Sequence, residues 1–431
     1  MSMNFDEALA YLDEHMSYHK TGRIESPSVD GITKLCAGLG DPQHAAPVIH
    51  VTGTNGKGST VQMISRLLAA QGLTVGTYTS PHLEVINERF KRNGEPITDE
   101  ELAEQIAAVA EIAPLVDVEP GYFEILTAAA FRWFADIAVD VMVIEVGLLG
   151  RWDATNVVDS QVAVVTNIGL DHTEFAGPSL FDVANEKSGI VKHGSAVIIG
   201  ETDPDLVDVF RNAGGASTIE RGDGFDTVSN ALAVGGRLVD LRTPTTIYTD
   251  VFVPLNGAHQ GINASCALAA VETFFAAPLP DDVVREGFEA VTMPGRFEVV
   301  GRQPLTIIDG AHNPAGADVC ASVFFEDFDP EGRRILVAAT LREPAEMLAA
   351  LRADEFDIVF VATAPSPRGI PAADLEQAAK ALGCDHVVAF DTVDAACKRA
   401  VEYADGDDAI LIAGSLYTAG AARTTLLLTA N

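Results

Sequence analysis

A short apolar run, followed by a glycine-rich turn and a helical stretch, constrains the fold of this chain more than any other feature. Residues 47–60 read PVIHVTGTNGKGST, and apolar residues with helical periodicity continue to Ala70. This order is typical of a strand, a phosphate-binding loop and a helix, because glycines let backbone amides approach an anion at the helix N-terminus. Lys57 would supply a positive charge, and the Ser59 hydroxyl could reach Mg²⁺. A plain glycine-rich turn with a surface lysine is the alternative.

The loop is a variant of the usual phosphate loop. Val51 stands where the usual spacing has a glycine, and Gly58 separates Lys57 from Ser59. The strand before the loop and the helix after it nevertheless favour a phosphate site.

Length and composition indicate a globular chain of more than one domain. With 431 residues and 48% hydrophobic residues, two domains are expected. No apolar stretch of about 20 residues occurs, so we expect no membrane span. Residues 1–7, MSMNFDE, lack the basic region of a signal peptide. The five cysteines are scattered without a CxxC pair, which predicts reduced thiols, no zinc site and a cytoplasmic protein.

The charge balance limits the possible partners. Asp and Glu number 62 against 28 Lys and Arg, which gives a formal net charge of −34. A phosphate backbone requires a basic surface, so nucleic acid is excluded as a partner. An anionic substrate would need a locally positive pocket. Adaptation to a saline interior and ordinary solubility both explain the acidic composition.

Alternating strand-length and helix-length segments predict an α/β fold with parallel sheets. The expected strands are 48–51, 75–78, 141–146, 162–166, 196–199, 306–308, 335–338, 358–362, 386–389 and 409–413. The expected helices are 59–71, 99–112, 123–134, 265–275 and 371–382, the last with a proline suited to a first helical position. Several strands are apolar on both faces, as buried parallel strands are.

Two further segments define the domain organisation. Residues 213–255 are rich in Gly, Thr and Asp, which predicts a β insertion or a small antiparallel sheet. The Pro294-Gly295 pair is the strongest punctuation before a second α/β series. We therefore expect one domain over residues 1–295 and a second over residues 296–431.

Polar residues follow several expected strands, at the edge where α/β folds place their sites. Glu145 ends a buried strand, where a carboxylate is costly unless a cation neutralises it, and His172 follows the next strand. Together with the phosphate loop they favour Mg²⁺. Lys187 taken alone reads as a surface lysine near a helix C-terminus. Asp309–Pro314 follows a strand of the second domain, which suggests a cleft that closes by domain movement.

These segments together resemble folylpolyglutamate synthase, a family of the Mur ligase superfamily that is often also a dihydrofolate synthase. The resemblance runs in order from about residue 5 to 420 and is carried by residues 50–59 (HVTGTNGKGS), 79–83 (TSPHL), 145–156 (EVGLLGRWDATN), 259–263 (HQGIN), 294–298 (PGRFE), 309–314 (DGAHNP) and 414–417 (GSLY). It implies an N-terminal P-loop ATPase domain with a parallel sheet and a C-terminal Rossmann-like domain. It also implies a cytoplasmic monomer that joins L-glutamate to a folate or dihydropteroate carboxylate through an acyl phosphate, with ATP and one or two Mg²⁺ ions.

The resemblance also assigns roles to individual residues. The nucleotide contacts it implies are Thr54, Asn55, Gly56, Lys57, Gly58, Ser59, Thr60, Asn263, Arg296 and Asp309. The metal ligands are Ser59, Ser80, Glu145 and His172, and the folate contacts are Phe123 and Arg151. The catalytic residues are Lys57, Lys187 and His312. Lys187 matches a lysine that is carbamylated in these ligases, which reverses its interpretation as a surface residue.

The chain departs from the family at two places, and two rival functions stand beside the ligase. Leu149-Gly150 replaces a usual Gly-Gly pair, and residues 340–344 read TLREP where an Asp-Lys-Asp signature is usual, which affects the amino-acid contact. A ligase of peptidoglycan precursors would need a further N-terminal domain, for which Gly53 leaves no room. A regulatory P-loop ATPase would not need the cluster at Asp309–Pro314.

Overall fold

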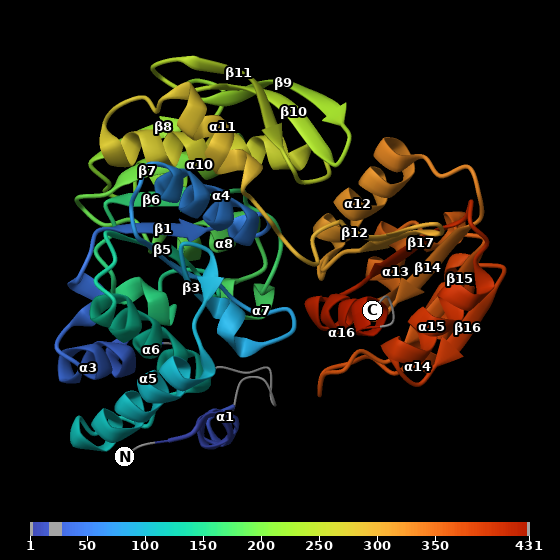
Figure 1. Cartoon of the computed structure of the whole chain (residues 1–431), viewed down its shortest axis with the longest axis horizontal. Helices are drawn as coiled ribbons and strands as arrows, with labels where there is room; N and C mark the ends of the chain where they lie inside the picture. Colours follow the sequence, from blue (N-terminus) through green and yellow to red (C-terminus); the bar gives the residue numbers. More distant parts are fainter. Residues whose placement is uncertain (1–2, 17–27, 429–431) are drawn as a thin grey trace.

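Three sheets organise the chain, in a computed structural model that describes residues 3–16 and 28–428. Figure 1 shows two lobes, a larger one from blue to yellow and a smaller one in orange and red. The first two sheets lie in the larger lobe and the third lies in the smaller one. The α/β class expected from the sequence is confirmed. Met1 and Ser2, part of the segment that lacks a signal-peptide pattern, lie outside the described residues.

The first sheet has the strand order β4-β3-β2-β5-β1-β6-β7-β8. Its strands are β1 (Val48–Thr52), β2 (Val75–Tyr78), β3 (Phe90–Arg92), β4 (Glu95–Pro96), β5 (Val141–Glu145), β6 (Val162–Val165), β7 (Ala196–Ile199) and β8 (Ser217–Glu220). The strands from β2 to β8 along this order are parallel, whereas β3 and β4 pair antiparallel at one edge. The central strand β1 lies between β5 and β6.

Helices cover both faces of this sheet (Figure 1). One face carries α4 (Lys57–Ala70), α10 (His259–Phe275) and α11 (Asp281–Glu289). The other carries α1 (Phe5–Glu14), α3 (Asp30–Gly38), α5 (Asp99–Ile112), α6 (Tyr122–Asp136), α8 (Leu180–Ser188) and α9 (Pro204–Arg211). The β1 side chains alternate between these two cores, with Ile49 and Val51 in one and Val48 in the other. Burial on both faces explains why the strands are apolar throughout.

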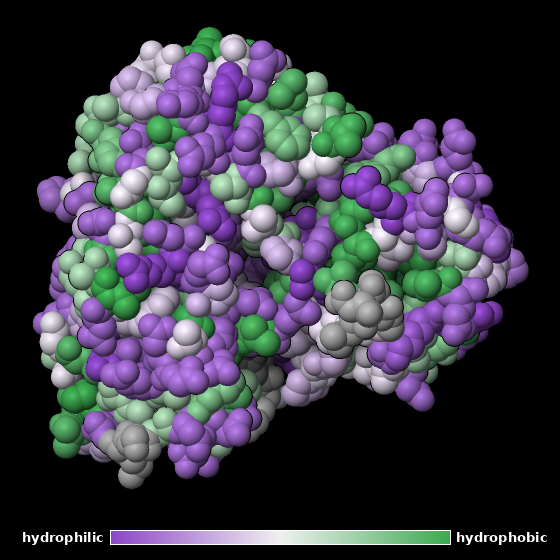
Figure 2. All heavy atoms as spheres, in the orientation of Figure 1, coloured by the Kyte–Doolittle hydropathy of each residue, from purple (hydrophilic) through white to green (hydrophobic). Residues whose placement is uncertain are grey.

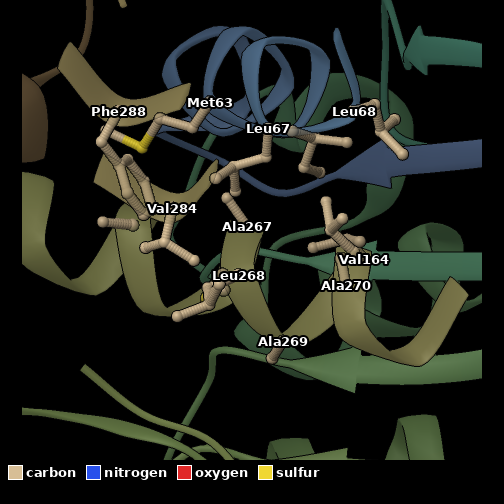
Figure 3. Close-up of a cluster of buried hydrophobic side chains, with 14 of the residues drawn as sticks. Met63, Leu67, Leu68, Val164, Ala267, Leu268, Ala269, Ala270, Val284 and Phe288 are labelled. Carbon is tan, nitrogen blue, oxygen red and sulfur yellow. The ribbon is translucent and has the colours of Figure 1, made fainter. Parts of the chain in front are cut away.

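The first core lies between α4, α10 and α11 (Figure 3). Met63 of α4 lies beside Phe288 of α11, Leu67 lies above Ala267 of α10, and Leu68 lies on the side of Val164 and Ala270. Helices α4 and α11 approach closely at Gly287, since a Cβ placed there would lie only 2.9 Å from Leu67 Cδ2. This packing holds α4, and with it the loop that precedes the helix, against the sheet.

A three-stranded antiparallel sheet packs beside α10, in the order β11-β10-β9. Its strands are β9 (Asp226–Ala233), β10 (Gly236–Arg242) and β11 (Ile247–Val253). The sequence predicted either a β insertion or a small antiparallel sheet over residues 213–255, and the sheet is present. Ser217–Glu220 from the same segment joins the first sheet instead, as β8.

The third sheet has the order β12-β13-β17-β14-β15-β16, and only β12 at its edge runs antiparallel to its neighbour. Its strands are β12 (Glu298–Arg302), β13 (Leu305–Ile308), β14 (Arg334–Ala338), β15 (Ile358–Ala362), β16 (Val387–Phe390) and β17 (Ala409–Ala413). One face packs against α12 (Pro314–Ser322), a π-helix η5 (Val323–Phe328), α13 (Pro344–Ala350) and α14 (Ala372–Leu382). The other packs against α15 (Val393–Tyr403) and α16 (Leu416–Leu428).

All ten strands expected from the sequence are present, with ends that differ by at most two residues. Three expectations need correction. The antiparallel edge strands β3, β4 and β12 were not expected, because β3 and β4 are very short and β12 is only partly buried, with Glu298 and Arg302 at its ends. Helix α10 begins at His259, six residues before the expected start, because polar residues fill its first turns. Pro371 is the N-cap residue of α14 and not its first helical residue.

The domain boundary after residue 295 stays a prediction, although strands of different sheets lie on its two sides.

The described residues contain no helix with both the length and the apolar character needed to cross a bilayer. All five cysteines are buried and unpaired, as expected from their spacing.

Leu67→Ala tests the packing of α4. Leu67 is fully buried, so the truncation should leave a cavity and lower the free energy of unfolding by about 2–5 kcal/mol. Urea unfolding followed by circular dichroism measures the change. Leu115 is 79% exposed, and Leu115→Ala should therefore change the stability by less than about 0.5 kcal/mol. Equal effects for the two variants would contradict the packing described.

Candidate active site

The turn between β1 and α4 has the geometry of an anion-binding loop. Gly53 and Gly56 both adopt positive φ values, +149° and +80°, and Gly56 is the N-cap residue of α4. A Cβ on Gly53 would lie 1.8 Å from Thr166 Oγ1, and one on Gly56 would lie 2.5 Å from Asn263 Oδ1. Any side chain at these positions would displace a neighbour. The turn therefore exposes backbone amides at a helix N-terminus, where an anion is stabilised.

Two lysines bind the same carbonyl at this turn. Lys57 Nζ donates to Gly53 O at 3.0 Å, and Lys187 Nζ donates to it at 2.7 Å. Lys187 lies in the last turn of α8 and is only 4% exposed, so the interpretation as a surface lysine from sequence alone is wrong. Burial lowers the pKa of Lys187 far below the usual value, and the nearby charge of Lys57 lowers it further.

Glu145 ends β5 directly beside β1 and is 5% exposed. Its Oε2 accepts a hydrogen bond from Ser80 N at 3.0 Å, and no salt bridge neutralises it within the described residues. Burial raises the pKa of Glu145, and the charge of Lys57 opposes that rise. A buried carboxylate without a salt bridge, beside hydroxyl groups, has the donor character that Mg²⁺ prefers.

The segment after β6 supports the loop from the other side of β1. Asn167 Oδ1 accepts from Asn55 N at 3.0 Å, and Thr54 N donates to Asn167 O at 2.9 Å. His172 follows with φ +51°, and its Nδ1 has no hydrogen-bond partner among the described residues. Burial lowers the pKa of His172, which favours the neutral imidazole that coordinates metals.

The second lobe contributes residues from the end of β13. Asp309 accepts hydrogen bonds from Phe297 N at 2.8 Å and Ala311 N at 2.7 Å. Burial raises the pKa of Asp309, and the Arg296 guanidinium opposes the rise. Arg296 donates to Gly310 O at 3.1 Å. This hydrogen bond joins the linker between the lobes, which contains Arg296 and Phe297, to the segment that follows β13.

One cavity of about 1820 Å³ joins these groups, and it opens between the two lobes, where Figure 2 shows a groove. The predicted site residues that line it are Thr54, Asn55, Gly56, Lys57, Gly58, Ser59, Ser80, Phe123, Glu145, His172, Asn263, Arg296, Asp309 and His312. Three predicted residues are absent from its lining, namely Thr60, Arg151 and Lys187. No group of three or more His, Cys, Asp or Glu residues with metal-site geometry occurs in the described residues, so the predicted metal ligands remain a prediction.

The three residues outside the lining have different surroundings. Thr60 is fully buried, and its hydroxyl has no partner in the described part of the chain. Arg151 donates to Asn185 O at 2.9 Å, and its Nε lies 3.8 Å from Oε1 of Glu186, which lines the cavity. Lys187 lies behind the loop, at the Gly53 carbonyl. A contribution of Lys187 to the cavity would therefore have to pass through its neighbours or follow a modification of its amine.

Sequence reasoning missed several residues of the cavity. Tyr122 and Trp152 join Phe123 as aromatic walls, and Trp152 is 48% exposed. Trp152 lies in the recognised segment 145–156. Its position next to Arg151 could therefore have predicted it as a site residue. Arg342 bridges the lobes, with Nη2 2.5 Å from Asp171 Oδ1, and nothing in the sequence marked that pair.

Comparison with known proteins identifies the relatives of this chain. Residues 123–271 match the family described as the Mur ligase middle domain, and residues 295–416 match the Mur ligase, glutamate ligase domain. A Mycobacterium tuberculosis protein named dihydrofolate synthase/folylpolyglutamate synthase is 38% identical, over 92% of this chain and 90% of its own length.

Solved structures agree. Mycobacterium tuberculosis folylpolyglutamate synthase complexed with ADP superposes with a TM-score of 0.91 at 36% identity, covering 98% of both chains. A Yersinia pestis bifunctional folylpolyglutamate synthase/dihydrofolate synthase, complexed with AMPPNP and a Mn ion, gives a TM-score of 0.86 at 31% identity, covering 99% of this chain and 98% of that chain.

Gly53→Ala tests the phosphate loop. The added Cβ would collide with Thr166, so we expect the turn to be displaced and the affinity for ATP to fall by at least about tenfold. Isothermal titration calorimetry measures the affinity. Gly194 has open space around it, and Gly194→Ala should leave binding unchanged. An unchanged affinity in the Gly53→Ala protein would remove the loop from the site.

Proposed function

This chain belongs to the folylpolyglutamate synthase/dihydrofolate synthase family of the Mur ligases, and from that premise we propose how its residues perform the ligation. The enzyme is an ATP-dependent ligase that adds L-glutamate to the carboxylate of a folate or dihydropteroate, giving ADP and phosphate. One observation carries the residue assignments. The loop, buried Glu145 and the Arg296–His312 region of the second lobe all face a single cavity.

The first step transfers a phosphoryl group from ATP to the pterin carboxylate, which is a poor acyl donor without activation. The loop amides from Gly56 to Ser59 would hold the β- and γ-phosphates, since those of Thr54, Asn55 and Thr60 already donate within the protein. Lys57 would balance the charge that spreads over the transferring group. Asn263, Arg296 and Asp309 would bind the nucleotide, since all three line the cavity close to the loop or the second lobe. His312 would lie beside the reacting phosphate.

The residues at the loop fit a divalent ion. Glu145 is a buried carboxylate without a salt bridge in the described chain, and the Ser59 and Ser80 hydroxyls line the same cavity. The His172 Nδ1 atom has no hydrogen-bond partner among the described residues, and Glu174 Oε1 lies 3.7 Å from it. We propose these four as ligands of one or two Mg²⁺ ions, consistent with the Mn ion of the Yersinia pestis structure. A bound divalent ion would screen the phosphate charge during transfer.

We propose that Lys187 carries a carbamate. Its buried amine has a strongly lowered pKa, so the neutral nitrogen needed for attack on CO₂ is available. The amine and CO₂ form a carbamate anion, and one proton is released. Because both lysine side chains meet at Gly53 O, the carbamate would lie near the Lys57 ammonium and attract it. The new anion would also support the metal ligands from behind the loop.

The pterin acid would occupy the end of the cavity with the aromatic walls. Phe123 stacks on Tyr78 with ring centroids 6.0 Å apart, and Tyr122 and Trp152 line the same cavity as Phe123. Flat heteroaromatic rings bind well between such side chains. Arg151 is held at Asn185 O, so it would contact a folate only after turning towards the cavity.

The acyl phosphate then takes the amine of L-glutamate. The tetrahedral intermediate collapses with loss of phosphate, and water must be kept away because it would hydrolyse the anhydride. Closure of the two lobes over the cavity serves this purpose.

We further propose a monomer in the cytoplasm. Both lobes of one chain supply the cavity, and five unpaired thiols suit a reducing compartment.

Substrate-dependent ATP hydrolysis tests the function. The unaltered protein should release phosphate only when ATP, L-glutamate and dihydropteroate or tetrahydrofolate are all present. Comparing the two pterins determines whether dihydropteroate is accepted. Lys57→Ala should lower kcat by about 100- to 1000-fold. Lys398→Ala, in an exposed pair with Asp394, should not. Full hydrolysis of ATP alone would favour a regulatory ATPase.

Lys187→Ala tests the carbamate. We expect ligation to fall by about 10- to 100-fold, because the support behind the loop is lost, and to recover in part with added acetate or formate. Lys192→Ala is the matched control. Lys192 Nζ donates to Asn156 O at 2.9 Å away from the cavity, so rescue by carboxylates should be absent there. An active enzyme whose crystal structure contains unmodified Lys187 would contradict the proposal.

A further inference from the structure

The small antiparallel sheet contacts the second lobe through a buried arginine. Arg237 of β10 is 6% exposed, and its Nη1 lies 3.1 Å from Asp327 Oδ2 of η5. Figure 1 shows β10 and the α12 region facing each other across the two lobes. A pair of this kind is screened little by salt, since the guanidinium is removed from solvent. It therefore persists in a chain whose exposed charges are mostly acidic.

The other nitrogens of Arg237 bind the neighbouring strand. Nε donates to Asn230 Oδ1 at 2.8 Å, and Nη2 donates to Asn230 O at 3.2 Å. Asn230 in turn donates from Nδ2 to Ala258 O at 2.7 Å. Ala258 is the N-cap residue of α10. A continuous set of contacts thus runs from the second lobe to the first turn of α10.

That turn belongs to the cavity. His259, Gln260 and Asn263 of α10 all line it, and Asn263 lies against Gly56 of the phosphate loop. The charge of Arg237 is close enough to contribute to the lowered pKa of His259, after burial and Arg296. A shift of Arg237 would therefore reach the nucleotide end of the cavity through one side chain, Asn230.

The opposite end of the contact also reaches the cavity. Asp327 lies in η5, whose first residue, Val323, lines the cavity. Phe328 of η5 packs against Phe297 of the linker with ring centroids 5.2 Å apart. Phe297 N is bound to Asp309. The pair between Arg237 and Asp327 thus joins two elements that each border the space proposed for ATP.

We propose that Arg237 is a positioning residue that couples nucleotide binding to closure of the two lobes through Asp327 and Asn230. The inference rests on the proposed function, because it takes ATP as the ligand of the cavity. A ligand that bridges the lobes binds the closed arrangement more tightly, and in this proposal the ion pair is lost when the lobes separate. By linkage, removal of the pair must weaken nucleotide binding, although no residue of the pair lines the cavity.

Asp327→Asn is the first variant, because Asp327 is partly exposed and the change is isosteric. Its Kd for the non-hydrolysable analogue AMPPCP should rise by about fivefold or more, measured by calorimetry. Arg237→Met should have at least the same effect, and the double variant should be no weaker than Arg237→Met alone. Asp327→Glu should restore part of the affinity. The control is Arg242→Met, which removes contacts to Asp223 O and Gly222 O within the larger lobe only.

Small-angle X-ray scattering supplies a readout that a purely structural role would not change. AMPPCP should reduce the radius of gyration of the unaltered protein and of Arg242→Met, but less so that of Asp327→Asn. A Kd for Asp327→Asn within twofold of the unaltered value, or additive effects in the double variant, would overturn the coupling alone. Failure of the unaltered protein to bind AMPPCP would instead refute the ligase assignment and the coupling with it.

Discussion

The arrangement of the site depends on the position of β1 in the middle of the first sheet. Because β5 and β6 flank it in parallel, the segments that follow these three strands emerge at one edge. Glu145 therefore reaches the turn from one side and Asn167 from the other. The turn itself is tight enough that Gly53 O accepts from two lysines. The residues that the second lobe contributes, such as Asp309 and His312, line the same cavity as this turn.

The sequence predicted the parts of the fold that local patterns determine. Buried strands such as Val141–Glu145 are apolar on both faces, and the turn after β1 has glycines where positive φ is needed. Of the site residues that the recognised motifs predicted, fourteen line one cavity. The features that the sequence did not predict depend on contacts between residues far apart in the chain. The contact that buries Lys187 joins residues 134 positions apart, so its helix-end location suggested exposure.

The same reason explains the residues that were not anticipated. Arg342 and Asp171 are 171 positions apart, and Arg237 and Asp327 are 90 apart. Each pair joins residues of the two lobes, and neither has a local sequence pattern. The sequence predicted that an anionic substrate would need a locally positive pocket, and the cavity is instead close to charge balance. In a chain with 62 acidic and 28 basic residues, the cavity gathers Lys57, Arg89, Arg221, Arg296, Arg342 and Arg368, close to balance with its carboxyl groups. An anionic substrate thus meets a far less negative environment there than the chain as a whole presents.

The five buried cysteines have a practical consequence. Each thiol is at most 8% exposed, so maleimide dyes would react with them slowly. Cysteines introduced at exposed positions would label selectively without removal of the native thiols. Val234 at the tip of the β9–β10 turn is 96% exposed, and Val401 on α15 in the other lobe is 39% exposed. A donor and an acceptor fluorophore at these two sites would turn the chain into a single-molecule ruler for the distance between its lobes during turnover.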